Sequence, residues 1–149
     1  MADISLVVEI AAPGNLVFAF FVPQRMPYWY GTESATSFEV QGGAAEFETG
    51  QKVRITGRVA SREVSLTTIV MRYEWGRLLE WRFQDSYGVR GLQRWDLEPA
   101  SSGTRVRMRD SYEMPGRFGW LADWLLTRHA VARRDRDALA RLKRLIERK

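Results

Sequence analysis

The sequence predicts an α+β protein in which a curved antiparallel sheet of about seven strands wraps around one long C-terminal helix. Three observations support this prediction. Apolar side chains recur at helical spacing after residue 115, nearly everything before them reads as strand, and the connections between the strands are short. Short connections require antiparallel neighbours. A long apolar helical stripe needs cover, and a curled sheet is the only other element large enough to supply it.

The first elements are a strand at residues 4–10 and a short helix that begins near Pro13. Proline is favoured in the first turn of a helix, where its missing N–H is not needed. Pro23 and Pro27 end the helical segment, and the aromatic run at residues 26–30 follows as a loop or a single turn. Two short helical segments are therefore expected after the first strand.

Six further strands are predicted from runs of β-branched and aromatic residues between turn signals. They cover residues 34–41, 51–59, 63–74, 77–85, 89–98 and 104–113. The turn at Trp75 and Gly76 admits two registers, which leaves open whether Val70 or Met71 points inward.

Turn chemistry predicts the register of the next two hairpins. A three-residue loop at 86–88, with glycine in the left-handed position, places Trp81 opposite Gln93 and Glu80 opposite Arg94. An opposite-charge pair on the outer face agrees with that register, because a slip by one residue would break it. In the following hairpin, pairs of opposite charge on the outer face place Gln93 opposite Asp110 on the inner face.

The C-terminal helix is predicted over residues 117–146, roughly 30 residues and about 45 Å long. Its apolar stripe consists of Leu121, Leu125, Ala132, Leu139, Leu142 and Ile146. The charged residues between them, Arg134 and Asp135 included, are interpreted as facing water. We expect Leu121, Leu125, Leu139 and Ile146 to be buried against the sheet.

Length and composition limit the class of protein. The 149 residues, 45% of them hydrophobic, are expected to form a single domain over 1–149. With no cysteine and one histidine, no metal and no cofactor are expected. The longest apolar run, residues 16–22, is too short to cross a membrane, so no stable membrane insertion is expected and the default location is cytoplasmic. Oligomeric state is left open.

The net charge of +5 is concentrated in the helix, because residues 117–149 hold ten Lys or Arg and four Asp or Glu. A solvated face with i, i+4 pairs, such as Arg133 with Asp137, explains this pattern. A surface for anionic lipid is the alternative. No nucleic-acid partner is expected, since no aromatic interleaving or known motif accompanies the charge.

The order of the elements is that of the helix-grip fold, and the sequence resembles the START-like (SRPBCC) superfamily, in particular its polyketide cyclase/dehydrase branch. The resemblance is carried by VEIAAP at 8–13 with Val17 and Phe18, MPYW at 26–29, GTRV at 103–106 and YEMPG at 112–116. Phe18 stands where the family commonly has tryptophan. The resemblance implies an elongated apolar cavity between sheet and helix, open near the short helices. It also implies a ligand such as a lipid, sterol, quinone, hormone or polyketide.

Few inward-facing side chains can carry chemistry. Asp110 falls on the inner face by strand spacing, and together with Tyr112 it is the acid/base candidate. Either an inward arginine, Arg72 or Arg128, pairs with Asp110, or its oxygens meet an empty cavity. Asp85 is interpreted as the exposed end of its strand.

His129 lies at the edge of the helical stripe and is interpreted as a boundary residue, with a cavity-facing acid or base as the alternative.

The predicted pocket follows a polar row of Trp81, Gln93 and Asp110 across three strands, with apolar side chains on both sides. Gly91 beside it is taken to leave room, and Tyr28 or Trp29 is expected near the entrance. The candidate ligand-binding residues are Tyr28, Trp29, Trp81, Phe83, Gly91, Gln93, Trp95, Met108, Asp110, Tyr112, Leu125 and His129.

Three functions fit these features. The first is a carrier or sensor that binds a hydrophobic small molecule, a lipid or an aromatic compound. The second is a cyclase or dehydratase that uses Asp110 and Tyr112 as acid and base. The third is an interaction module that uses the basic face of the helix.

Overall fold

A computed structural model describes the chain except residues 1, 31–36, 43–44, 60–61, 114–119 and 149, and except the side chains of residues 2, 58–59, 62 and 120–127. Its elements are β1 (Ala2–Ile10), α1 (Gly14–Phe18), η1 (Met26–Tyr28), β2 (Ser37–Val40), β3 (Lys52–Val59), β4 (Arg62–Glu74), β5 (Leu78–Asp85), β6 (Arg90–Ala100), β7 (Gly103–Glu113) and α2 (Trp120–Glu147).

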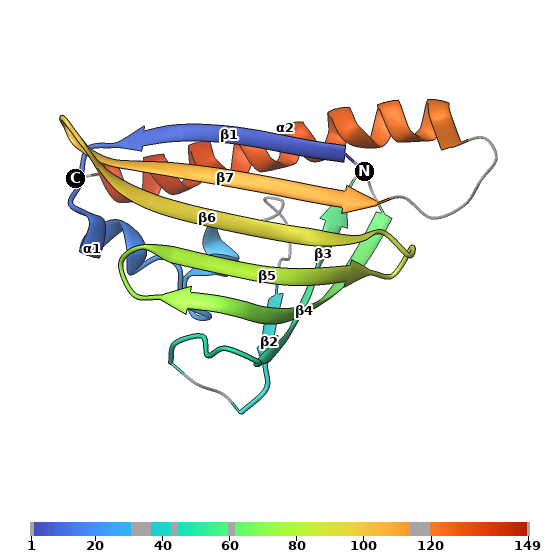
Figure 1. The fold of residues 1–149 in the computed structure, drawn as a ribbon, viewed down its shortest axis with the longest axis horizontal. Helices are drawn as coiled ribbons and strands as arrows, with labels where there is room; N and C mark the ends of the chain where they lie inside the picture. The colour runs from blue at the N-terminus through green and yellow to red at the C-terminus, as the bar shows by residue number, and fades with distance from the viewer. Residues whose placement is uncertain (1, 31–36, 43–44, 60–61, 114–119, 149) are drawn as a thin grey trace.

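The strands form one seven-stranded antiparallel sheet in the order β1-β7-β6-β5-β4-β3-β2. Only β1 is out of sequence order, because it pairs with the last strand instead of the second. Figure 1 shows α2 running along the β1 side of the sheet, while β2 and β3 cross behind β4 and β5 at a steep angle. The predicted helix-grip fold is confirmed.

The predicted registers are confirmed in both hairpins. Trp81 pairs with Gln93 and Glu80 with Arg94, and the next hairpin pairs Gln93 with Asp110. Gly88 takes the left-handed conformation with φ of 88°, as a three-residue loop requires. The charge pair that supported the register is present, with Arg94 Nη1 3.2 Å from Glu80 Oε2.

The open register at the β4–β5 hairpin is decided by a bulge between Val70 and Arg72. Val70 is fully buried, whereas Met71 is 36% exposed. A bulge inserts one residue into a single strand. The bulge therefore shifts the alternation of inward and outward side chains by one residue. For this reason, alternation along the strand fits two registers and cannot choose between them.

The first helix starts one residue later than predicted. Pro13 lies at the N-cap of α1 with extended backbone, and Gly14 is the first helical residue. Val17 and Phe18 are fully buried. The proline ring fits the N-cap because that position, like the first turn, needs no N–H donor.

The C-terminal half of α2 supplies the helical side of the core. Leu139 and Leu142 are buried, and Ala132 and Ile146 pack against the core as partly buried residues. The side chains of Leu121 and Leu125, and residues 117–119 of the predicted helix, lie outside the described residues. Asp135 contradicts the prediction, since it is 2% exposed instead of facing water. No helix in the described ranges is both long and apolar enough to cross a membrane.

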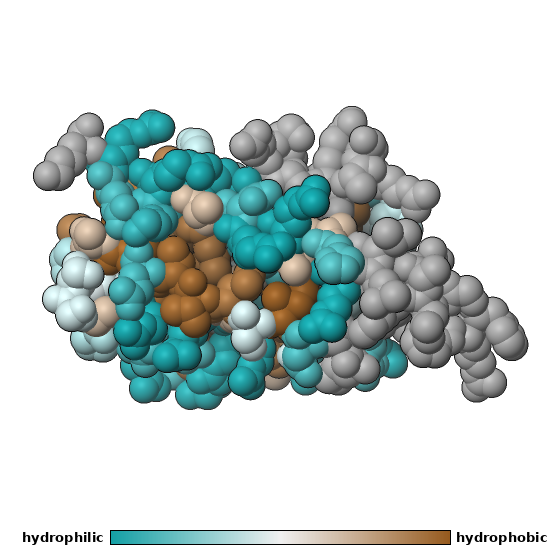
Figure 2. Space-filling model, turned by 90° about the horizontal axis from the view of Figure 1, so that it is seen from above, coloured by the Kyte–Doolittle hydropathy of each residue, from teal (hydrophilic) through white to brown (hydrophobic). Residues whose placement is uncertain are grey.

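Side chains of α2 also occupy the free edge of β1. Lys143 Nζ donates a hydrogen bond to the carbonyl oxygen of Glu9 at 2.6 Å. Beyond the end of the strand, the N–H of Ala11 donates to Glu147 Oε2 at 2.8 Å. Figure 2, seen from above Figure 1, shows apolar side chains framed by hydrophilic ones on this side. Edge strands offer unpaired backbone groups to other chains, and α2 reduces that exposure here.

Gly91 is required by a close backbone approach and does not leave room for a ligand, so that part of the prediction is wrong. A Cβ at this position would lie 1.9 Å from the carbonyl oxygen of Ser111 and 2.7 Å from the Cα of Tyr112. Both atoms belong to the backbone of β7, which cannot move without disturbing the sheet.

We therefore expect Gly91→Ala to lower the free energy of unfolding by about 1–3 kcal/mol, the usual cost of overpacking. Gly14→Ala is the matched control, because its Cβ would meet its nearest neighbour at an ordinary 3.8 Å. Urea unfolding of both variants measures the difference. Equal midpoints would contradict the steric explanation.

Candidate functional site

The centre of the inner face is filled by aromatic side chains. Trp81 and Trp95 are fully buried, with ring centroids 5.1 Å apart. Trp29 packs 6.3 Å from Trp95, and Tyr30 lies 5.6 Å from Trp81. These edge-on contacts are those of a packed aromatic core.

Trp29 belongs to this core and does not line an entrance. It is 1% exposed, and its Nε1 donates to the carbonyl oxygen of Phe20 at 2.8 Å. Its neighbour Tyr28 is 73% exposed. Of the two aromatic residues predicted near the mouth of a pocket, only Tyr28 is therefore accessible.

Gln93 links the aromatic core to the buried carboxyl of Asp110. Its Oε1 accepts hydrogen bonds from Tyr30 Oη at 2.7 Å and from Trp81 Nε1 at 2.8 Å. Its Nε2 donates to Asp110 Oδ2 at 3.2 Å. The structure thus brings together the row of Trp81, Gln93 and Asp110 that the sequence predicted, as one hydrogen-bonded chain.

The cation beside Asp110 is Arg134 of α2, and neither arginine considered from the sequence fills this role. Arg134 Nη2 lies 3.4 Å from Asp110 Oδ2 and 3.2 Å from Asp135 Oδ1. Arg72 pairs instead with Glu74, and Arg128 donates to the carbonyl oxygen of Asp3.

Sequence reasoning missed Arg134 and Asp135 because it assigned the charges of the helix to water. The spacing of Asp135 along the helix nonetheless indicates a buried position. Asp135 lies three residues after Ala132 and four before Leu139, which places it within the apolar stripe. A carboxyl at that position is buried with the apolar residues around it, so it needs a buried hydrogen-bond or charge partner.

The site holds two buried carboxyls and one cation. Burial raises the pKa of Asp135 well above its usual value, the Arg134 guanidinium opposes this, and the neighbouring Asp110 adds to the rise. Within the described residues, neither Asp110 Oδ1 nor Asp135 Oδ2 has a hydrogen-bond donor. A proton held between the two carboxyls gives both oxygens a partner and makes the Arg134 cluster neutral.

Two buried donors, Trp95 Nε1 and Tyr112 Oη, also have no acceptor in the described part of the chain. Burial, and then the nearby Asp110, raises the pKa of Tyr112 to about 12, so the phenol keeps its proton at neutral pH. A buried donor without an acceptor costs about 1–3 kcal/mol. Each donor therefore has an unmet hydrogen bond among the described residues.

The proton on Asp135 gives a pH prediction with a definite sign. Because the pKa is raised on folding, the stabilisation from the protonated form is present below the usual value of 3.8 and is lost as pH rises through the folded value. Asparagine has no proton to lose. We expect Asp135→Asn to gain stability relative to the unmodified chain as pH rises from about 4 to neutral.

Asp137→Asn is the matched control for this prediction, because Asp137 is an exposed carboxyl on the same helix. Melting temperatures of the three proteins across the pH range provide the measurement. A constant difference between Asp135→Asn and the unmodified chain would mean that Asp135 is ionised in the folded state.

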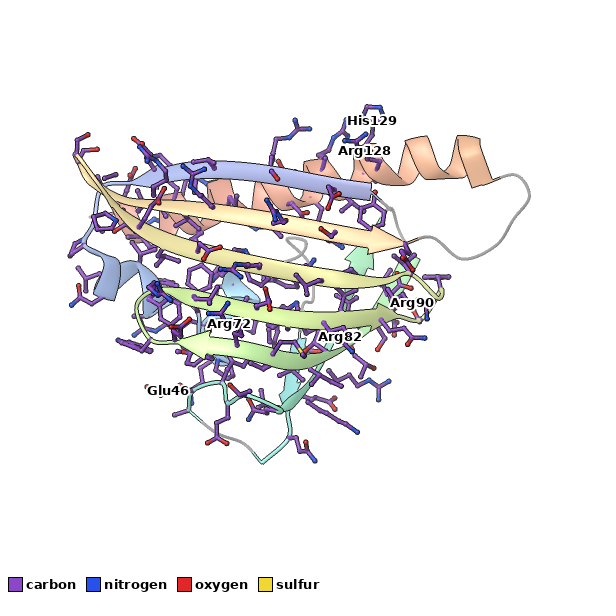
Figure 3. The ribbon with its side chains drawn as sticks, viewed as in Figure 1. Glu46, Arg72, Arg82, Arg90, Arg128 and His129 are labelled. Carbon is purple, nitrogen blue, oxygen red and sulfur yellow. The ribbon has the colours of Figure 1, made fainter. Side chains whose placement is uncertain are left out.

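The other predicted site residues lie apart from this cluster or serve the fold. Asp85 Oδ1 accepts hydrogen bonds from the backbone N–H groups of Tyr87 and Val89, so it orders the hairpin turn as its position suggested. His129 is exposed and points away from the sheet (Figure 3). Phe83 and Met108 are buried in the core. The side chain of Leu125 is outside the described residues.

Among the described residues, no group of three His, Cys, Asp or Glu side chains is placed to hold a metal ion.

An antiparallel sheet around a C-terminal helix, with polar groups buried on an apolar inner face, defines a helix-grip protein of the START-like class. The chain belongs to the family described as "Polyketide cyclase / dehydrase and lipid transport", which it matches over residues 1–147. Fold and family together suggest a hydrophobic ligand. No curated protein matches the sequence.

Solved structures support the fold. Protein MLL2253 from Mesorhizobium loti superimposes with a TM-score of 0.74 at 16% identity, covering 99% of this chain and 98% of that one. Protein Ms6760 from Mycobacterium smegmatis gives a TM-score of 0.75 at 11% identity over 99% and 91% of the two chains. DynU16, a protein of the dynemicin biosynthetic locus, gives 0.70 at 21% identity and covers 98% of this chain, which spans 47% of DynU16.

Proposed function

We propose that the chain binds a hydrophobic small molecule against the inner face of the sheet, at the Asp110 and Tyr112 end of the polar row, as a carrier or sensor. The observation that carries this proposal is the buried phenol of Tyr112, whose Oη has no hydrogen-bond partner in the described part of the chain. A ligand carbonyl or ether oxygen would satisfy such a donor in surroundings that are otherwise apolar.

The proposed site is shifted from the predicted pocket toward Tyr112 for a physical reason. Trp81 and Trp95 are fully buried in a packed aromatic core, which leaves no room for a ligand beside them. On the Tyr112 side, the phenol is buried and has no hydrogen-bond partner among the described residues. The proposal therefore concerns that side.

Native mass spectrometry of the freshly purified chain, with titration of the neutral probe N-phenyl-1-naphthylamine, tests this proposal. We expect a retained apolar molecule or saturable probe binding, weakened about tenfold in Tyr112→Phe, which corresponds to the loss of one hydrogen bond of about 1.4 kcal/mol. Tyr73→Phe is the matched control, because its phenol donates to the Phe21 carbonyl oxygen. No bound molecule and no saturable binding, or equal affinity in both variants, would contradict it.

A second candidate function, dehydration, is favoured by the carboxyl pair, which offers an acid and a base together. On a β-hydroxy carbonyl substrate, the Asp110 carboxylate would take the α-proton while Asp135 gives its proton to the departing hydroxyl. A carbon–carbon double bond forms, water leaves, and the proton on Asp110 returns to Asp135. Arg134 would hold the pair near neutrality throughout.

A β-hydroxy thioester with an aromatic substituent is a suitable test substrate for this activity. We expect Asp135→Asn to lower turnover by about 10²–10⁴-fold, the usual effect of losing a general acid, while probe binding is kept. Turnover equal to that of the unmodified chain, or absent from both proteins, would exclude the dehydratase and leave the carrier.

A further inference from the structure

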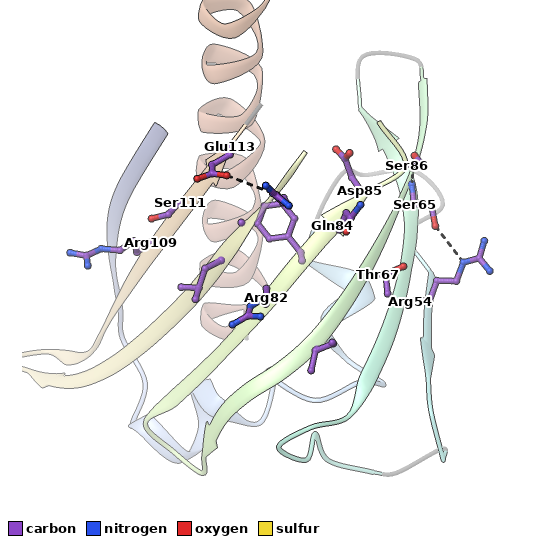
Figure 4. Close-up of a pocket in the computed structure, with 15 residues that line it drawn as sticks. Arg54, Ser65, Thr67, Arg82, Gln84, Asp85, Ser86, Arg109, Ser111 and Glu113 are labelled. Atoms are coloured by element: carbon purple, nitrogen blue, oxygen red, sulfur yellow. Dashed lines mark hydrogen bonds and ion pairs between the residues drawn. The ribbon is translucent and has the colours of Figure 1, made fainter. Parts of the chain in front are cut away.

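The outer face of the sheet holds a groove of about 1090 Å³ on the side opposite to the buried carboxyls (Figure 4). Its lining comes from β3 to β7 and from the turn after β5. One row across it joins Arg54, Thr67, Gln84, Arg90 and Glu113, which are paired in register from strand to strand. The five strands are separated by four interstrand distances, so the row is about 19 Å long.

The groove carries more positive than negative charge. Four arginines line it, against the two carboxylates of Asp85 and Glu113. The Asp85 carboxylate is engaged by two backbone N–H groups of the turn, and Glu113 lies 3.6 Å from Arg90. In the described part of the chain, no hydrogen bond or ion pair holds Arg82 or Arg109.

This excess is confined to one half of the outer face. In the other half, Arg94 lies between Glu80 and Asp96, and Arg105 and Arg107 share Glu98, with every ion-pair distance between 2.7 and 3.4 Å. The same face of the sheet thus pairs these arginines with carboxylates in one half, whereas in the groove Arg82 and Arg109 are exposed and have no ion pair among the described residues. An excess limited to the groove indicates a site for negative charge.

The floor of the groove is partly apolar. Ile69, which is 38% exposed, and Leu92 lie on either side of Arg82 in one cross-strand row. A partner that matches this surface presents an apolar strip flanked by carboxylates. A nucleic acid fits less well, because a phosphate backbone has no apolar strip to set on Ile69 and Leu92.

We propose that this groove docks an acidic amphipathic helix of a partner protein. A helix is about 10–12 Å wide, and the row of about 19 Å corresponds to about 13 helical residues. Small-molecule sites enclose most of their ligand, whereas this groove is open along its length, which suits a helix that keeps its outer face in water. The inference is independent of the ligand site, which lies on the inner face.

A labelled 13-residue peptide, with leucine on one helical face and glutamate on both flanks, serves as the probe for this proposal. Fluorescence polarisation is expected to give saturable micromolar binding that weakens as salt rises. In NMR spectra, the shifts that change are expected to belong to the outward residues of β4 to β7. A peptide of the same composition in scrambled order is expected to bind at least tenfold more weakly.

The decisive variant is the double change Arg82→Gln and Arg109→Gln, with Arg133→Gln and Arg136→Gln as the control that removes the same charge from exposed positions on α2. We expect the first to weaken binding at least tenfold and the second less than twofold. Equal loss in both, no binding of the ordered peptide, or equal binding of the scrambled peptide or of a single-stranded oligonucleotide overturns the proposal.

Discussion

Replacing Leu139 by aspartate is expected to destabilise the chain by about 4 kcal/mol or more, a large part of the roughly 5–15 kcal/mol by which domains are usually stable. Leu139 is 2% exposed and belongs to the core cluster that α2 shares with the sheet. The substitution removes a buried leucine, which alone costs about 2–5 kcal/mol, and leaves a carboxylate in an apolar site. The Arg134 guanidinium is already paired with Asp110 and Asp135, so it cannot also neutralise a carboxylate at position 139.

Arg136→Asp is the control for this prediction, because Arg136 is exposed on the same helix. It is expected to change the free energy of unfolding by less than about 1 kcal/mol, as surface substitutions usually do. Urea denaturation followed by circular dichroism compares the two. If Leu139→Asp unfolds at the same urea concentration as Arg136→Asp, the helix does not pack against the sheet as described.

The fold could be predicted from the sequence because its determinants are local and agree with one another. The turn at Gly88 and the charge pair of Glu80 with Arg94 point to the same register, and a strand has only two faces to choose between. The bulge near Val70 shows the limit. Nothing in the spacing of apolar residues reveals an extra residue, because both registers leave an acceptable pattern.

The site was harder to predict because it depends on contacts between distant parts of the chain. Trp29 lies in a loop segment, and only the tertiary packing decides whether such a ring lines an entrance or fills the core. Gly91 marks a close approach of two backbones, which a sequence shows only as a missing side chain. Arg134 reaches a strand residue 24 positions away, and no local pattern connects the two.

Removing the guanidinium of Arg134 should have the second large effect, a loss of about 3–5 kcal/mol in Arg134→Met at neutral pH. Methionine fills similar space on a helix, so the loss is mainly electrostatic. Asp110 and Asp135 are 1% and 2% exposed, and without the cation one buried carboxylate has no opposite charge. The loss should be smaller at acid pH than at neutral pH, because a buried carboxyl that carries a proton needs no opposite charge.

Two further variants separate this explanation from lost packing. Arg133→Met changes the exposed neighbour in the same way and should stay within about 0.5 kcal/mol of the unmodified chain. Adding Asp110→Asn to Arg134→Met removes the charge left behind, and it should restore a large part of the lost stability at neutral pH. Thermal unfolding at acid and neutral pH measures all four proteins. If the double variant is no more stable than Arg134→Met, or if the loss is the same at both pH values, Arg134 acts through packing and the two carboxyls do not need its charge.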